Sequence, residues 1–140
     1  MTFTRWSVGL AAMALCAAPA LAESLDSPKL PFSEAVRVGS MLYLSGAMGI
    51  DASGALVPGG IEAETRQALA NIRAALERHG SSMDRVVKCT AMLADMGEWA
   101  AMNRVYIEHF SMDLPARSAF GVSGLALGGR VEIECFATVE

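Results

Sequence analysis

The spacing of apolar residues along the chain predicts strands toward both ends and helices between them. Two short apolar runs, residues 35–38 and 41–44, are separated by a Gly-Ser pair, which is typical of a β-hairpin. Residues 61–79 instead carry leucine, isoleucine and alanine at helical spacing, with acids at the start and bases at the end. Because Gly80 follows, this stretch is expected to form one amphipathic helix.

The second half of the chain repeats this alternation. Residues 86–93 are rich in β-branched side chains and short enough for a strand, and residues 99–110 return to helical spacing. Residues 117–122 and 130–139 are the last two expected strands. The order β-β-α-β-α-β-β predicts an α+β fold with a mixed sheet and both helices on one face. The other face would be apolar and uncovered, which favours oligomerisation.

The first 22 residues have a different character. One basic residue, an uncharged apolar run and small residues before Ala22 have the order of a secretory signal peptide. We therefore expect a signal at residues 1–22, a loose leader at 23–34 and one domain at 35–140, in a protein that is periplasmic or secreted. An uncleaved anchor is the alternative, and a cytoplasmic protein follows if the segment is not a signal.

Charge and cysteine content restrict the partners. The formal net charge is −4, and loss of Arg5 with the signal makes it −5. No basic cluster is present, so neither nucleic acid nor, after cleavage, a membrane is an expected partner. Cys89 and Cys135 lie in apolar, strand-like runs and are expected to be buried free thiols, although an oxidising compartment leaves a disulfide open. Histidines and cysteines lack metal-ligand spacing, so no metal and no cofactor is predicted.

The candidate chemistry lies in the last two expected strands. Arg117 begins one of them, and Glu132 lies in the next, fifteen residues later. A guanidinium binds a small carboxylate through a forked contact, and a glutamate can orient or deprotonate a water beside it. If both side chains open from neighbouring strands into one crevice, they form a site for a small organic anion and a hydrolytic water. The alternative is an ion pair between strands on a solvated face.

The chain resembles the RidA/YjgF family of reactive-intermediate deaminases over almost all of residues 31–139. Five segments carry the resemblance, namely Pro31-Phe32-Ser33-Glu34-Ala35-Val36, Leu44-Ser45-Gly46, Glu64-Thr65-Arg66-Gln67-Ala68-Leu69-Ala70-Asn71-Ile72, Met102-Asn103-Arg104-Val105-Tyr106, and Pro115-Ala116-Arg117-Ser118 with Val131-Glu132-Ile133-Glu134. The resemblance implies a chorismate-mutase-like fold and a homotrimer with sites in clefts between subunits. It also implies hydrolysis of enamines and imines, such as 2-aminoacrylate, to 2-keto acids and ammonia.

The resemblance assigns roles to particular positions of this sequence. Arg117 would hold the substrate carboxylate and Glu132 would position the water. The remaining substrate-binding positions implied are Phe32, Ser45, Gly46, Asn103, Tyr106 and Ser118. The chain departs from the family where Phe32 replaces a frequent tyrosine, Ala47 a common glutamine and Ala119 a frequent cysteine. These changes make the predicted pocket more apolar and leave the identity of the preferred substrate open.

Two other functions remain open from the sequence. The first is a non-catalytic trimer that binds small carboxylates, which needs Arg117 but not Glu132. The second is a ribonuclease or translation inhibitor, names that some relatives carry. The acidic composition and the expected export disfavour the second reading.

Overall fold

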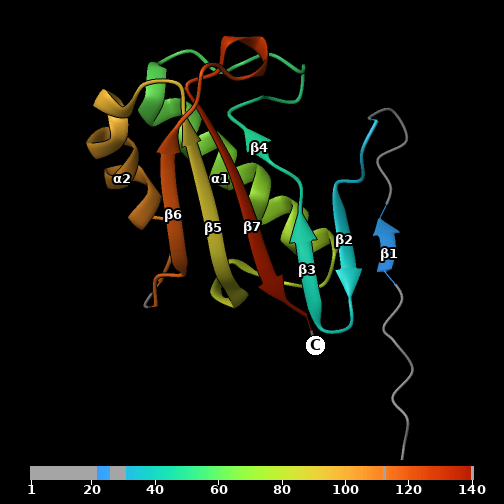
Figure 1. Ribbon diagram of the computed structural model, residues 1–140. Coiled ribbons are helices and arrows are strands. Elements are labelled where there is room, and N and C mark those ends of the chain that lie inside the picture. Colours follow the sequence, from blue (N-terminus) through green and yellow to red (C-terminus); the bar gives the residue numbers. More distant parts are fainter. Residues whose placement is uncertain (1–21, 26–30, 112, 140) are drawn as a thin grey trace, which may run out of the picture.

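The computed structural model describes residues 22–25, 31–111 and 113–139 (Figure 1). The strands are β1 (Ala22–Leu25), β2 (Ala35–Val38), β3 (Met41–Leu44), β4 (Ala47–Met48), β5 (Val86–Leu93), β6 (Ala116–Gly121) and β7 (Val131–Thr138). The helices are α1 (Gly60–Arg78) and α2 (Trp99–Ile107), with short 3₁₀ turns η1 (Met83–Arg85), η2 (Met96–Glu98) and η3 (Ala126–Gly128). The predicted signal peptide lies outside the described residues except for Ala22.

All the described strands belong to one mixed sheet. Its order is β1-β2-β3-β7-β5-β6, and β4 pairs with β7 beyond the end of β3 (Figure 1). β5 and β6 run parallel, whereas the other neighbours run antiparallel. The last strand of the chain, β7, therefore lies in the centre of the sheet.

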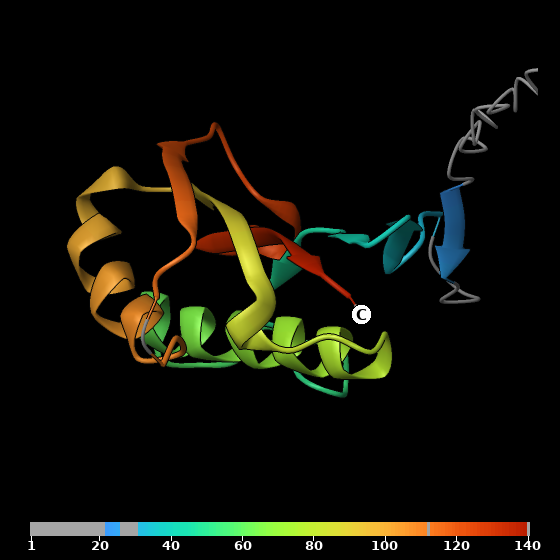
Figure 2. The same ribbon diagram turned by 90° about the horizontal axis from the view of Figure 1, so that it is seen from below.

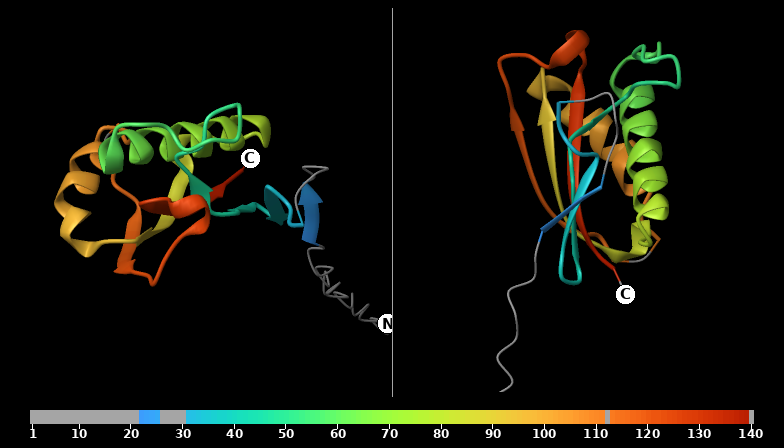
Figure 3. Two further views of the ribbon diagram at one scale, coloured as in Figure 1. Left: turned by 90° about the horizontal axis from the view of Figure 1, so that it is seen from above. Right: turned by 90° about the vertical axis from the view of Figure 1, so that its right-hand side faces the viewer.

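Both helices cover the same face of this sheet (Figure 3), so the predicted α+β architecture is confirmed. Every second residue of β5 and β7 is buried beneath them, including Leu93 and Ile133. Side chains on the opposite face, called the open face below, include Met41, Tyr43, Met92, Phe120 and Phe136. Tyr43 and Phe120 are exposed there, and the rings of Tyr43 and Phe136 lie 5.0 Å apart. The open face thus carries exposed apolar side chains beside polar ones such as Lys88 and Ser118, and neither of the described α-helices covers it.

Two buried polar side chains of α1 have hydrogen-bond partners, one within the helix and one at the sheet. The Thr65 hydroxyl donates to the carbonyl oxygen of Ile61 at 2.6 Å, which satisfies a buried hydroxyl inside the helix. The buried carboxylate of Glu64 accepts a hydrogen bond from the backbone N–H of Arg130 at 2.7 Å. Because Arg130 precedes β7, this bond ties the first turns of α1 to the start of the central strand. A side chain at Gly49, which lies against the backbone of Glu64, would break that packing.

Two strands were not predicted. β1 pairs antiparallel with β2, so residues 23–25 of the predicted leader, 23–34, form part of a strand instead of a loose segment. In Figure 2, β1 and β2 lie to one side of the part of the sheet that α1 covers. β4 has only two residues, which is too short for any hydrophobic period to reveal.

The prediction of free thiols is also wrong, because Cys89 and Cys135 form a disulfide. The two residues are directly opposite in the register of β5 and β7, with their Cα atoms 4.1 Å apart. Both side chains are buried beneath the helices. The bond therefore joins the two central strands through the hydrophobic core.

We expect the double variant Cys89→Ala, Cys135→Ala to unfold more easily than the parent chain. A crosslink that closes a loop of 46 residues restricts the unfolded chain and contributes about 2–4 kcal/mol to the free energy of unfolding. Urea titrations with and without dithiothreitol measure this difference. The reductant should lower the midpoint of the parent chain only, and equal midpoints for both proteins under oxidising conditions would contradict the expectation.

Candidate active site

Predicted site residues line two clefts on the described part of the chain. The first, of about 780 Å³, lies between α1 and the region where β3 gives way to β4. Phe32, Ser45, Gly46 and Glu132 are among its lining residues. The second, of about 450 Å³, lies between α2 and the start of β6, and it contains Asn103, Tyr106 and Arg117. The predicted site residues thus divide between two separate places.

Arg117 is held in the second cleft by an aromatic ring. Its guanidinium carbon lies 4.6 Å from the centroid of the Tyr106 ring, and its Nη1 lies 3.9 Å from the sulfur of Met102. Among residues 31–111 and 113–139, no carboxylate forms an ion pair with Arg117. Stacking on a ring leaves the edge of the guanidinium, which carries its N–H donors, available to a planar anion.

Two buried polar groups beside Arg117 also lack partners within the described chain. They are the hydroxyl of Tyr106 and the side-chain oxygen of Asn103. Tyr106 is only 3% exposed, and burial raises its pKa to about 12 although the charge of Arg117 acts in the opposite direction. The phenol therefore stays protonated at neutral pH and can donate a hydrogen bond. Buried groups without partners are costly, so their clustering around a free guanidinium is typical of a ligand site.

Glu132 lies in the first cleft and depends on a glycine. It stands opposite Met48 in the register of β7 and β4, and its carboxylate lies against the backbone of Gly46. A Cβ atom at position 46 would collide with the Glu132 carboxylate. Gly46 therefore leaves the room in which this carboxylate sits.

The prediction that Arg117 and Glu132 open from neighbouring strands into one crevice is wrong within a single chain. β5 lies between their strands, and Arg117 aligns with Cys89 on the face that the helices cover. Glu132 aligns with Met92, which faces the open side. Since side chains alternate along a strand, the two groups project to opposite faces. The alternative of an ion pair between them is excluded for the same reason.

The other predicted site residues follow this division, except for Ser118. Its hydroxyl lies 2.8 Å from Nζ of Lys88, which donates to it on the open face. Ser118 therefore points away from Arg117 although it is the next residue, and it lines neither of the two clefts. Ser45 lines the first cleft, but its hydroxyl donates to the carbonyl oxygen of Ser33 at 2.7 Å, so it braces the wall.

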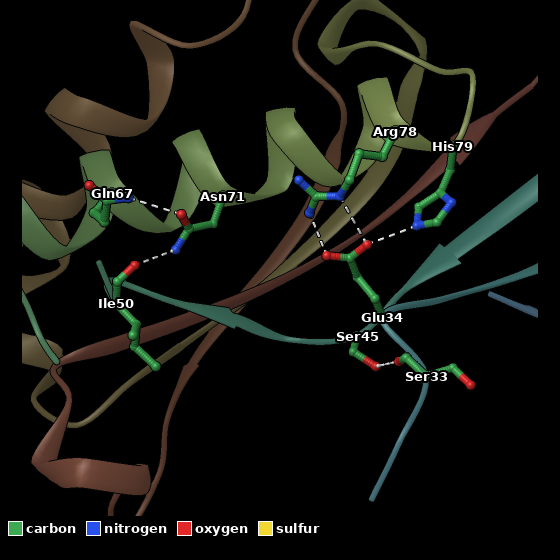
Figure 4. A network of polar contacts seen from close by, with 8 residues as sticks. All are labelled: Ser33, Glu34, Ser45, Ile50, Gln67, Asn71, Arg78 and His79. Carbon is green, nitrogen blue, oxygen red and sulfur yellow. Dashed lines mark hydrogen bonds and ion pairs between the residues drawn. The ribbon is translucent and has the colours of Figure 1, made fainter. Parts of the chain in front are cut away.

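Sequence reasoning gave no role to the polar wall that α1 contributes to the first cleft (Figure 4). Nδ2 of Asn71 donates to the carbonyl oxygens of Met48 and Ile50 at 3.0 and 2.9 Å, and Gln67 donates to Asn71. These bonds hold β4 against α1. In the sequence, both residues appear only as part of the segment 64–72 that carries the family resemblance. A polar side chain within a predicted helix does not reveal which loop it binds.

A second polar group closes the other end of this cleft. The carboxylate of Glu34 lies between the guanidinium of Arg78 and Nε2 of His79, at 2.5 and 2.8 Å (Figure 4). The hydrogen bond from Arg78 is the main reason that the pKa of Glu34 is lowered, and the hydrogen bond from His79 adds to it against the effect of burial. The network ties the segment before β2 to the end of α1, beside Phe32.

Among the described residues, no group of histidine, cysteine or acidic side chains has an arrangement that could hold a metal ion. Nor does the described part of the chain contain a helix with the length and apolar character needed to cross a membrane.

Together, these features define an α+β protein with two separate clefts. One presents the guanidinium of Arg117, which can bind a small anion, and the other presents the carboxylate of Glu132 beside Gly46. A family model described as endoribonuclease L-PSP matches residues 24–139. The chain therefore belongs to the endoribonuclease L-PSP family, which is the RidA/YjgF family that its sequence resembles.

Individual relatives agree with this assignment. The chain is 48% identical over 108 residues to a 2-iminobutanoate/2-iminopropanoate deaminase of Capra hircus, which covers 76% of this chain and 79% of that protein. The solved structure of yeast Mmf1 matches with a TM-score of 0.80 at 30% identity, over 86% of this chain and all of the other. RidA from an Antarctic Psychrobacter matches with a TM-score of 0.76 at 35% identity, over 83% and 94% of the two chains.

We expect Glu34→Gln to weaken folding in a pH-dependent manner. Because the folded-state pKa of Glu34 is lowered, its contribution is present above the ordinary glutamate range and is lost as pH falls through the lowered value. The group is partly exposed, so the difference at pH 7 should be about 1 kcal/mol or less. Urea unfolding at pH 7 and pH 3 measures it, and a difference that grows on acidification would contradict this account.

Proposed function

We propose that this chain is an enzyme that hydrolyses reactive 2-imino acids, including the imine form of 2-aminoacrylate, to 2-keto acids and ammonia. The observation that carries the proposal is the guanidinium of Arg117, stacked on Tyr106 and without a carboxylate partner among the described residues. The names of its relatives supply the substrate class, because several are 2-iminobutanoate/2-iminopropanoate deaminases.

The reaction needs few protein groups. The substrate carboxylate accepts two hydrogen bonds from Arg117, an interaction worth about 1.5–3 kcal/mol where a charged partner is involved. Glu132 takes a proton from a water as the water oxygen bonds to the imine carbon, and it passes this proton to the imine nitrogen to give a carbinolamine. The hydroxyl proton then moves through Glu132 to the amine nitrogen as the C–N bond breaks, which releases ammonia and leaves the 2-keto acid. A positioned general base contributes roughly 10²–10⁴-fold to such a step.

The two groups act together only if two subunits meet. Arg117 and Glu132 lie on opposite faces of one sheet, so a site with both takes Arg117 from one subunit and Glu132 from its neighbour. Exposed apolar side chains on the open face, such as Tyr43 and Phe120, support such an assembly because they gain from burial. A closed homotrimer, as the family resemblance implies, would repeat this junction three times.

Within that junction the remaining residues have distinct parts. The Tyr106 hydroxyl and Asn103 lie beside the guanidinium and can hydrogen-bond the substrate carboxylate or amine. Gly46 and Ser45 shape the wall next to Glu132, and Phe32, 52% exposed, offers an apolar surface at the mouth. Ser118, which faces Lys88, is not a substrate ligand in this arrangement.

The features of the chain fit a location in an oxidising compartment best. A disulfide between the central strands persists where thiols are not kept reduced, and residues 1–22 have the order of a secretory signal. We therefore infer that the protein acts after export, in the periplasm or outside the cell. The family model is named for an endoribonuclease, but a formal net charge of −4 disfavours binding to the RNA backbone.

We expect Arg117→Ala to lower kcat/KM for the imino acid formed from alanine by about 100-fold, because the carboxylate loses its charged anchor. Arg117→Lys should lose most of this activity too, since an ammonium cannot reproduce the fork. Ammonia release from imines generated by an amino-acid oxidase measures both. Arg66→Ala, which removes an exposed arginine of α1, is the matched control, and parental activity in Arg117→Ala would remove its assigned role.

A mixing experiment tests whether the site spans two subunits. Arg117→Ala and Glu132→Ala homo-oligomers should each be inactive, whereas co-refolded mixtures should regain about a quarter of the parental activity per subunit, since that fraction of junctions carries both groups in a random cyclic assembly. Absence of any recovery in verified mixed oligomers would place both groups in one chain's site and contradict the shared junction.

A further inference from the structure

The η3 turn before β7 holds a leucine in a backbone conformation that leucine rarely adopts. Leu127 has φ 57° and ψ 9°, and among the described residues it is the one non-glycine residue with positive φ. This left-handed conformation is unfavourable for an L-residue, and glycine or asparagine would occupy it more easily. The side chain is 67% exposed, so burial within the chain does not offset the cost. A strained, exposed leucine is typical of a contact with something else.

The turn is placed beside the candidate water-positioning glutamate. Leu127 and Ala126 line the first cleft together with Glu132. The turn rests on Met48, because a side chain at Gly129 would collide with the methyl group of Met48. Met48 in turn stands opposite Glu132 in the register of β4 and β7. The packing from η3 through Met48 therefore sets where Leu127 stands relative to the Glu132 carboxylate.

The same cleft is larger and more apolar than a three-carbon substrate needs. Its volume of about 780 Å³ lies in the range of sites that enclose drug-sized ligands. Leu44, Met48, Ile50, Ala126 and Leu127 contribute apolar side chains to it. An imino acid anchored by its carboxylate and attacked at its second carbon must direct its side chain away from both polar groups, toward such a surface.

We propose that Leu127 is a specificity-determining residue that contacts the side chain of the imino acid and favours aliphatic side chains of three or more carbons. The inference rests on the proposed function and adds to it the part of the substrate that distinguishes one imino acid from another. Leu127 does not touch the reacting atoms, so it selects substrates without taking part in the hydrolysis.

The test compares imino acids formed in situ from leucine and from alanine by an amino-acid oxidase. The measured quantity is the ratio of the two kcat/KM values, which cancels effects common to both substrates. Leu127→Ala should lower this ratio about 10-fold, since one apolar contact of this size discriminates by about 10–200-fold. Leu127→Gly should lower it equally while removing the backbone strain. Val87→Ala, at an exposed aliphatic position outside both clefts, should leave the ratio unchanged.

Three results would overturn the inference. The first is an unchanged ratio of kcat/KM values in both Leu127 variants. The second is a lower ratio in Leu127→Gly but not in Leu127→Ala. The third is an equal fall in kcat/KM for both substrates, together with dissociation of the oligomer in analytical ultracentrifugation. The last result would make Leu127 a subunit contact. In each case the parent chain still accelerates ammonia release, whereas failure of the proposed function would appear as no acceleration by the parent chain with any imino acid.

Discussion

The two-residue period of a β-strand is the constraint on which the proposed chemistry depends. It directs Arg117 toward α2 and Glu132 toward the opposite side of the sheet, with β5 between their strands. The proposed site needs both groups, so in that proposal activity depends on assembly.

Each half of the site is organised by short-range packing rather than by ion pairs. The Tyr106 ring supports the guanidinium in one cleft, and the absence of a side chain at Gly46 makes room for the carboxylate in the other. Asn71 and Glu64 attach β4 and the start of β7 to the same helix, so α1 sets the frame of the Glu132 cleft. These contacts organise the groups before any ligand arrives, which reduces the reorganisation needed during reaction.

The sequence predicted the helices and the strands β2, β3, β5, β6 and β7, because each has a hydrophobic period that can be recognised. It failed where the deciding contact is between distant residues. Cys89 and Cys135 lie 46 positions apart, and only the register of β5 with β7 brings them opposite. Likewise, residue types suggested that Arg117 and Glu132 act together, but their faces follow from the strand order, which puts β5 between them. Leu127 carried no sequence signal, since its conformation arises from the turn.

The central place of β7 has a consequence for how the protein reaches its folded form. Its pairing partners β3, β4 and β5 are all synthesised earlier, yet none can complete the sheet until β7 has emerged. Structure dominated by such long-range pairing forms slowly. A nascent chain whose central strand comes after all of its pairing partners therefore stays without a complete sheet for most of the synthesis of this domain.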